Sequence, residues 1–117
     1  ALVRSLKLQK RAARVGFDWP EISQVLDKID EETKELIEAK KTEPQERINE
    51  EFGDLMFSIV NLGRHLKVDP EEALKQTNRK FITRFNFVET SIRSQGKKIE
   101  DTSLEEMEAL WQQAKNP

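Results

Sequence analysis

Four carboxylates stand in two doublets with the same spacing. Glu32 and Glu35 are three residues apart, and Glu51 and Asp54 repeat that spacing further along the chain. Side chains three apart lie on one face of a helix, so each doublet can present two carboxylates together. If the two helices pack antiparallel, the doublets converge, and their negative charges need a cation to neutralise them. Mg²⁺ suits such a site, because it prefers oxygen ligands and also binds substrate phosphates.

A structural explanation competes with a metal site. Acidic side chains are mostly exposed, so a solvated surface position explains any one of these carboxylates readily. Asp54 is harder to explain in this way, because it lies among apolar residues and follows Gly53, and glycine weakens a helix interior. The glycine indicates close approach of a ligand or, equally, of a neighbouring helix. Both explanations stay open on spacing alone.

Basic residues also recur at helical spacing in the sequence. Lys28 precedes Glu32 by one turn, and Lys80 and Arg84 are four residues apart. Acids that hold a cation beside bases that hold phosphate oxygens are typical of metal-bridged phosphate binding. Salt bridges between helices explain the same residues about equally well.

The elements that position these residues are predicted to be helices only. No stretch shows the sustained alternation of a strand, and glycine, proline and capping residues divide the chain into amphipathic segments. A capping box of Asp18 and Glu21 is expected to open the second helix, and Asp69 is expected to cap the fourth. Gly16 is expected to end the first helix, and Phe81 is expected in the core. Five helices are predicted, at about 2–15, 19–40, 44–66, 70–95 and from 102 or 103 onward. Short turns between them favour an antiparallel bundle of four to five helices.

Composition limits the function classes. The 117 residues suit one small domain, 1–117, and 36% charged residues with 36% apolar residues suit long amphipathic helices. A formal charge of −2 gives no indication of a nucleic-acid polymer as partner. The lack of cysteine excludes thiolate chemistry, and one histidine excludes a multi-histidine metal site. No membrane segment or signal peptide is recognisable, so a cytoplasmic location is expected.

The sequence resembles a known family in four blocks that follow in order. "EETKE" at 31–35 and "EFGD" at 51–54 are similar to the E-E-x-x-E…E-x-x-D signature of the MazG-like all-α nucleoside triphosphate pyrophosphohydrolases. The blocks "LQKRAARVGFDW", "EEFGDLMFSIVNLGRHL", "NRKFITRF" and "LEEMEALWQQ" resemble the second, catalytic repeat of MazG proteins. Full MazG proteins carry two repeats, so the chain, which begins at Ala1, is expected to be one repeat of a longer protein or a shorter relative.

The resemblance implies hydrolysis of nucleoside triphosphates between the α and β phosphates, which gives the monophosphate and pyrophosphate. It also implies Mg²⁺ as cofactor, with Mn²⁺ as an alternative, and assembly into a tight homodimer. Carried over residue by residue, it predicts the metal ligands Glu32, Glu35, Glu51 and Asp54. Glu31 matches the first acid of the signature and is predicted to orient or activate water.

The substrate residues follow from the same resemblance. Lys28, Lys80 and Arg84 match positions expected to hold the triphosphate, and Asn78 is expected to assist. Trp111 matches a C-terminal tryptophan that would stack on the base, although core packing explains it equally well. Gln9, Lys10 and Arg14 could also reach a nucleotide, although solvated side chains are the commoner case.

Two other functions remain compatible with the residues. A non-catalytic helical dimerisation module would use the acids only for salt bridges between helices. A divalent-cation binder without hydrolysis is the third possibility, although no EF-hand loop of the D-x-D-x-D-G type is present.

Overall fold

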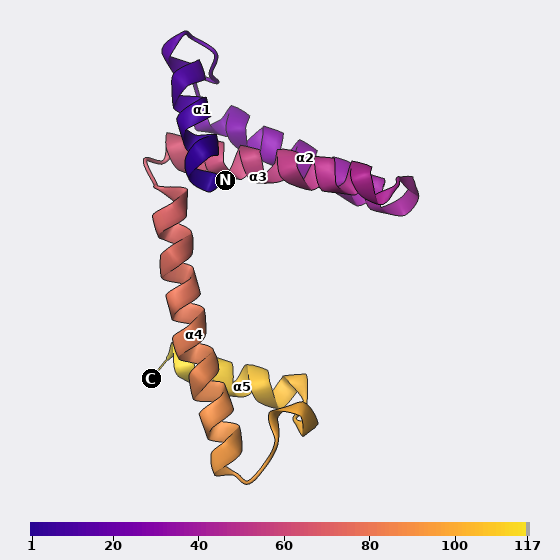
Figure 1. Cartoon of the computed structure of the whole chain (residues 1–117), viewed down its shortest axis with the longest axis vertical. Coiled ribbons are helices and arrows are strands. Elements are labelled where there is room, and N and C mark those ends of the chain that lie inside the picture. The colour runs from indigo at the N-terminus through magenta and orange to yellow at the C-terminus, as the bar shows by residue number, and fades with distance from the viewer. Residues whose placement is uncertain (117) are drawn as a thin grey trace. The chain divides into compact units, whose positions relative to one another are not determined.

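The computed structural model describes residues 1–116, and over that range its regular elements are helices (Figure 1). The prediction of an all-α fold is confirmed. The elements are α1 (Leu2–Arg14), α2 (Ile22–Thr42), α3 (Gln45–His65), α4 (Pro70–Ser94), the short 3-10 helix η1 (Ile99–Asp101) and α5 (Leu104–Lys115). Within the described residues, no helix is both long and apolar enough to cross a bilayer. The chain divides into two compact units, Ala1–Ala73 and Leu74–Pro117, which are described separately below.

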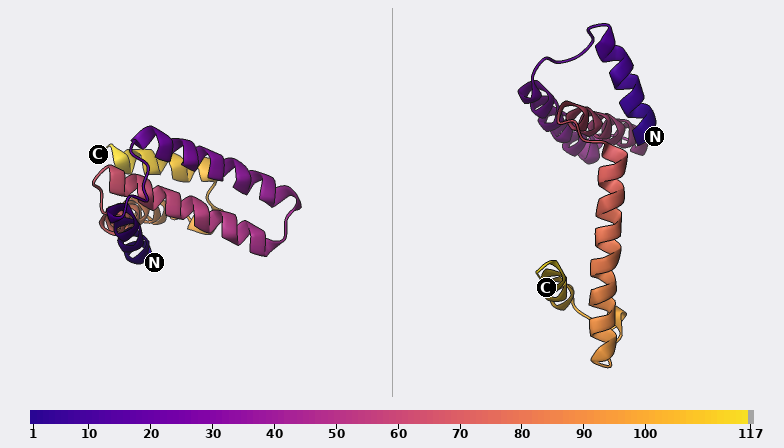
Figure 2. Two further views of the ribbon diagram at one scale, coloured as in Figure 1. Left: turned by 90° about the horizontal axis from the view of Figure 1, so that it is seen from above. Right: turned by 90° about the vertical axis from the view of Figure 1, so that its left-hand side faces the viewer.

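The centre of the first unit is a hairpin of α2 and α3, which lie side by side and run antiparallel (Figures 1 and 2). A short turn joins them because Pro44 disfavours helical geometry at the residue before it. Glu43 is accordingly extended, with ψ 153°, and Pro44 becomes the N-cap of α3. Val25 and Ala39 of α2 and Val60 of α3 are buried. This hairpin brings the two acid doublets onto facing helices.

Helix α1 packs on α3 and is followed by a loop that leads into α2. Gly16 has a φ of +90°, a left-handed conformation that glycine adopts without steric cost, so it ends α1 as expected. Gln9 attaches α1 to α3, because its Nε2 donates to the backbone oxygen of Phe57 at 2.9 Å. These contacts place the 15–21 loop and the last turns of α3 in the same unit as the acids.

The predicted capping box at the start of α2 is wrong by three residues. Glu21, not Asp18, is the N-cap, and its backbone N–H donates to the side chain of Gln24 at 3.3 Å. Asp18 has another role, because its carboxylate pairs with Arg64 and His65 at the end of α3. Asp18 therefore pairs with residues of α3 instead of capping α2.

The second unit contains α5 and most of α4. Val88 and Ile92 of α4 are buried, and Ser103 caps α5 by accepting from the backbone N–H of Glu106 at 3.2 Å, as expected. Phe81 was expected in the core, but it is 54% exposed and stacks on Phe85 with ring centroids 5.7 Å apart. The cap of α4 is also confirmed, since Asp69 accepts from the backbone N–H groups at the helix start.

The apolar stripes of α2 and α3 are only partly buried in the single chain. Ile37, Phe52 and Ile59 are 54%, 52% and 49% exposed, although the 3.6-residue spacing predicts burial. A two-helix hairpin covers only the faces that its helices turn toward each other. The remaining apolar surface is available for a partner.

Candidate functional site

Three carboxylates from α2 and α3 converge at one place. Glu32 and Glu35 come from α2 and Glu51 from α3, and one oxygen from each lies within 4.8 Å of the others. The antiparallel hairpin produces this arrangement from the two doublets. The cluster therefore brings together three of the four carboxylates expected to bind metal.

In each of the two buried acids of the cluster, only one carboxylate oxygen has a charged partner. Glu32 and Glu51 are 5% and 3% exposed. The Nζ of Lys28 lies 3.0 Å from Glu32 Oε1, and the Nη2 of Arg47 lies 2.7 Å from Glu51 Oε1. Each cation stands four residues before its acid, so the two pairs repeat one helical geometry.

The other oxygen of each buried acid has no protein partner. Oε2 of Glu32 and Oε2 of Glu51 are both buried and make no hydrogen bond within the described residues. An unpaired buried carboxylate oxygen costs free energy, and folded proteins seldom retain one without a reason. An oxygen-seeking cation between α2 and α3 would satisfy both atoms, and the donor set, all carboxylate oxygen, is the one that Mg²⁺ and Mn²⁺ accept.

The electrostatics of Glu35 agree with a crowded acidic site. Its pKa is raised above the ordinary value, first because the surroundings remove water from the carboxylate and then because Glu32 and Glu51 repel its charge. The pKa of Lys28 is also raised, chiefly by its hydrogen bond with Glu32. That of Arg47 is raised first by its bond with Glu50 and next by the charge of Glu51.

Two predicted catalytic acids lie next to the cluster but outside it. Asp54 is exposed and lines a cavity that also contacts Lys28 and Glu32. Glu31 is exposed, and its carboxylate lies 3.4 Å from the Nζ of Lys28. Their metal and catalytic roles stay predictions.

The cavity has a volume of about 730 Å³ and is lined by residues of α1, the 15–21 loop, α2 and α3. Its apolar wall comes from Leu8, Ala12, Phe17, Trp19 and Phe57. Its polar groups, apart from those at the acid cluster, come from Gln9, Asp18, Ser58, Asn61 and Arg64. Along α3 the lining residues run from Asp54 to Arg64, about 15 Å at 1.5 Å per residue. The cavity therefore joins the acids at one end to an aromatic and amide-lined region at the other.

A hydrogen-bonded network lies at the other end of the cavity, where Asp18, Asn61 and Arg64 are lining residues. Arg64 binds Asp18 through two nitrogens, with Nη1 3.1 Å from Asp18 Oδ2, and it donates to Asn61 Oδ1 from Nε and Nη2. His65 Nε2 lies 3.2 Å from Asp18 Oδ1. These bonds hold the pKa of Asp18 below its ordinary value, chiefly through Arg64. The network fixes the loop that carries Phe17 and Trp19.

The remaining predicted substrate residues belong to the second unit. Asn78 and Lys80 are exposed on α4. The guanidinium carbon of Arg84 lies 6.0 Å from the ring centre of Trp111, and Trp111 also contacts Phe81 with ring centroids 5.4 Å apart. Arg84 and Trp111 are thus close to each other, and their substrate roles stay predictions.

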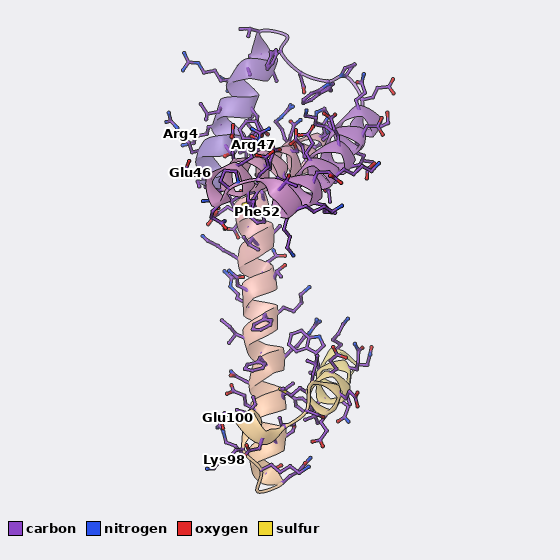
Figure 3. All side chains as sticks on the ribbon, turned by 90° about the vertical axis from the view of Figure 1, so that its right-hand side faces the viewer. Arg4, Glu46, Arg47, Phe52, Lys98 and Glu100 are labelled. Carbon is purple, nitrogen blue, oxygen red and sulfur yellow. The ribbon has the colours of Figure 1, made fainter. Side chains whose placement is uncertain are left out.

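Sequence reasoning did not select Arg47 for the site. Figure 3 labels Arg47 and Glu46, which both belong to α3. In the sequence, Arg47 stands one turn before Glu51. The sequence does contain a signal for Arg47, because it precedes Glu51 by four residues, just as Lys28 precedes Glu32. Asn61 and Arg64 were also missed, because their roles depend on the loop from which Asp18 reaches α3.

Fold and site together define an all-α protein with a carboxylate cluster of the kind that binds divalent cations. The family model described as the MazG nucleotide pyrophosphohydrolase domain matches residues 21–88, and the chain belongs to this family. The matched segment contains the whole acid cluster.

Individual relatives agree with the family. The chain is 48% identical over 115 residues to the nucleoside triphosphate pyrophosphohydrolase/pyrophosphatase MazG of Thermotoga maritima, with 98% of the chain and 44% of the relative covered. It is 45% identical over 117 residues to the nucleoside triphosphate pyrophosphohydrolase of Escherichia coli K12, with the same coverage. It is also 45% identical over 71 residues to the uncharacterized protein YabN of Bacillus subtilis, covering 61% of the chain and 14% of YabN. The chain thus spans less than half the length of the first two relatives.

Proposed function

We propose that this chain hydrolyses ribo- and deoxyribonucleoside triphosphates between the α and β phosphates, giving the monophosphate and pyrophosphate with Mg²⁺ or Mn²⁺ as cofactor. The observation that carries the proposal is the pair of unpartnered buried oxygens on Glu32 and Glu51, two residues that cluster with Glu35. Membership of the MazG family and the printed names of the relatives support the reaction class.

The metal would be held by Glu32, Glu35, Glu51 and Asp54. When bound, Mg²⁺ would withdraw charge from the phosphates and lower the pKa of an attacking water. Lys28 and Arg47 hold one oxygen of each buried acid and leave the other for the cation. These contacts hold the buried carboxylates in a fixed orientation before any ligand binds.

The chain's own groups also account for the phosphate chemistry. Oxygen of the attacking water forms a bond to the α phosphorus, its proton passes to a carboxylate, and the α–β bridging oxygen leaves with pyrophosphate. Glu31 is the candidate for orienting that water. Lys28 beside the acids, with Lys80 and Arg84 of α4, would hold phosphate oxygens and stabilise the negative charge that develops on the leaving group.

The nucleoside is assigned to the cavity beside the acids. Its volume of about 730 Å³ falls within the roughly 300–1,000 Å³ of small-molecule sites. Phe17, Trp19 and Phe57 supply flat apolar surface, and Asp54 and Glu32 lie where the phosphates would leave the cavity. Trp111 stays the alternative stacking residue. Replacing Trp19 or Trp111 by alanine and measuring KM would distinguish the two positions.

A homodimer is part of the proposal. The exposed apolar side chains of α3, among them Phe52, Met56 and Ile59, recur at helical spacing on a helix that also carries Glu51. A second copy of the chain is the proposed partner, because the resemblance to MazG-like proteins implies a tight dimer of helical subunits with sites near the interface. Analytical ultracentrifugation would test the oligomeric state directly.

The test of the function is pyrophosphate release. The protein is incubated with a panel of ribo-, deoxyribo- and damaged nucleoside triphosphates, with Mg²⁺ or with a chelator, and both products are quantified. Equal amounts of monophosphate and pyrophosphate, formed only with the metal, are expected. Release of single phosphate would contradict the bond assignment. A protein that forms dimers but releases no pyrophosphate would support the alternative, a non-catalytic dimerisation module.

A further inference from the structure

Two buried amide side chains line the cavity, and the directions of both are fixed by their partners. Gln9 of α1 is 7% exposed and Asn61 of α3 is 6% exposed, and both are lining residues. The oxygen and nitrogen of an amide have nearly the same shape, so hydrogen-bond partners decide which atom faces which way. In both residues the partner leaves only one orientation.

Gln9 presents an acceptor. Its Nε2 donates to the backbone oxygen of Phe57 at 2.9 Å, and because a carbonyl can only accept, the NH₂ end must face α3. Oε1 therefore points away from that carbonyl. It is buried and has no hydrogen-bond partner within the described residues. Such an acceptor is uncommon in a folded protein and indicates a donor supplied from elsewhere.

Asn61 presents a donor. Its Oδ1 accepts from Nε of Arg64 at 3.2 Å and from Nη2 at 2.7 Å. A guanidinium has only donors, so the amide oxygen must face Arg64 and the NH₂ group must point away from it. Arg64 is held in place by its pairing with Asp18. The orientation of Asn61 is thus set by residues outside the acid cluster.

The two amides meet the same part of α3. Gln9 binds at Phe57, and Asn61 follows one helical turn later on the same face. Asn61 lies about 10 Å beyond Asp54 along the helix axis. An ionised phosphate offers acceptors only, whereas the edge of a nucleobase offers donors next to acceptors. An acceptor beside a donor therefore matches a base and not a phosphate.

We propose that Gln9 and Asn61 form a base-reading pair, in which Gln9 Oε1 accepts from an N–H of the base and Asn61 Nδ2 donates to a neighbouring ring nitrogen or carbonyl. The inference rests on the proposed function and adds the residues that select the base. Asp18 and Arg64 act as positioning residues for Asn61. The selectivity of the site is then decided by α1 and the end of α3, not by the residues that bind metal.

The test compares triphosphates that differ by one group on the base. For the base that the wild-type chain prefers, kcat/KM is measured beside an analogue that lacks one N–H donor group, for example adenosine triphosphate against purine-riboside triphosphate, which lacks the 6-amino group. Gln9→Met is expected to lower kcat/KM for the base with the N–H by roughly 5- to 100-fold and to leave the analogue nearly unchanged. Asn61→Asp keeps the acceptor for Arg64 and removes the donor. It should cause a loss of similar size for bases with an acceptor at the matching position.

Exposed residues provide matched controls. Gln95→Met and Asn86→Asp make the same chemical changes at exposed positions of the second unit and should leave the selectivity unchanged. An equal loss for the base and its analogue, or a lowered Tm with unchanged selectivity, would show that the amides only attach α1 and the loop to α3.

Binding separates this inference from the proposed function. The affinity of each variant for nucleoside monophosphates, measured by calorimetry without metal, reports on the pair even when no reaction occurs. In one outcome, the wild-type protein releases no pyrophosphate, but its selectivity among the monophosphates is lost in Gln9→Met. This result would contradict the proposed function and support the base-reading pair. In the other outcome, the wild-type protein is active, but neither variant changes the affinities for the monophosphates. This result would overturn the base-reading pair and leave the proposed function intact.

Discussion

The first unit contains two charged clusters of opposite character. In the acid cluster of Glu32, Glu35 and Glu51, like charges meet, two buried oxygens lack partners, and the pKa of Glu35 is raised. In the network of Asp18 and Arg64, opposite charges meet, the donors of Arg64 find acceptors, and the pKa of Asp18 is lowered. Within the described residues, the first cluster leaves two buried oxygens without a hydrogen-bond partner, whereas the charged groups of the second cluster bind one another. Removing charge should therefore affect them in opposite ways.

The largest effect is expected in the acid cluster. Glu35→Gln should reduce pyrophosphate release by about 10²- to 10⁴-fold, the range that corresponds to several kcal/mol of metal-dependent stabilisation. The metal-free chain should stay helical and become more resistant to denaturant, because one of three repelling charges is lost. Steady-state kinetics and urea unfolding measure the two effects. Glu46→Gln, at the start of α3, is the control, and normal turnover in Glu35→Gln would refute the metal assignment.

A cation of the second unit tests whether that unit serves the same reaction. Lys80→Ala should raise KM by about 10- to 100-fold, because a hydrogen bond between charged groups contributes roughly 1.5–3 kcal/mol. The exposed position of Lys80 predicts little change in the unfolding midpoint. Lys115→Ala on α5 removes an exposed lysine elsewhere in that unit and should change neither quantity. Unchanged kinetics in Lys80→Ala would remove it from the substrate site.

The network at the end of α3 should respond as a structural element. Asp18→Asn is expected to lower the free energy of unfolding by about 1–2 kcal/mol, because it weakens charged hydrogen bonds that are partly exposed. KM should rise, since the loop that carries Phe17 and Trp19 loses its attachment, while kcat changes little. Asp30→Asn breaks an exposed pair with Lys34 and should cost less than about 0.5 kcal/mol. A fall in kcat that is larger than the rise in KM would indicate that Asp18 takes part in the chemical step.

The smallest effect is the pH dependence of the metal-free chain, which should have opposite signs for the two clusters. The pKa of Glu35 in the folded chain is raised above its ordinary value of 4.5. Its contribution to the free energy of unfolding is therefore fully present below pH 4.5 and is lost as the pH rises through the pKa of the folded chain. The pKa of Asp18 in the folded chain is lowered below its ordinary value of 3.8. Its contribution to the free energy of unfolding is therefore present above pH 3.8 and is lost as the pH falls through the pKa of the folded chain. Unfolding midpoints of wild type, Glu35→Gln and Asp18→Asn, measured in chelator from acid to neutral pH, isolate each term. Parallel curves for all three would contradict both assignments.

Sequence patterns predicted the helices better than the contacts between them. Caps at Asp69 and Ser103 and the glycine at 16 act within a few residues, so their outcome could be deduced from local chemistry. The expected cap at Asp18 failed because a bond to Arg64, 46 residues away, replaced it. The expected burial of Phe81 failed because periodicity defines a face and not what covers it.

By itself, the sequence determined that the chain is helical and that two carboxylate doublets share one spacing, since both follow from the 3.6-residue turn. It also determined the family, through motifs that cover nearly the whole chain. Only the tertiary structure decided which carboxylate oxygens are buried without a partner and which cations hold the others. It also decided the directions of the Gln9 and Asn61 amides. These properties depend on the register between α1, α2 and α3, and register is set by packing over the whole hairpin and not by any local stretch of sequence.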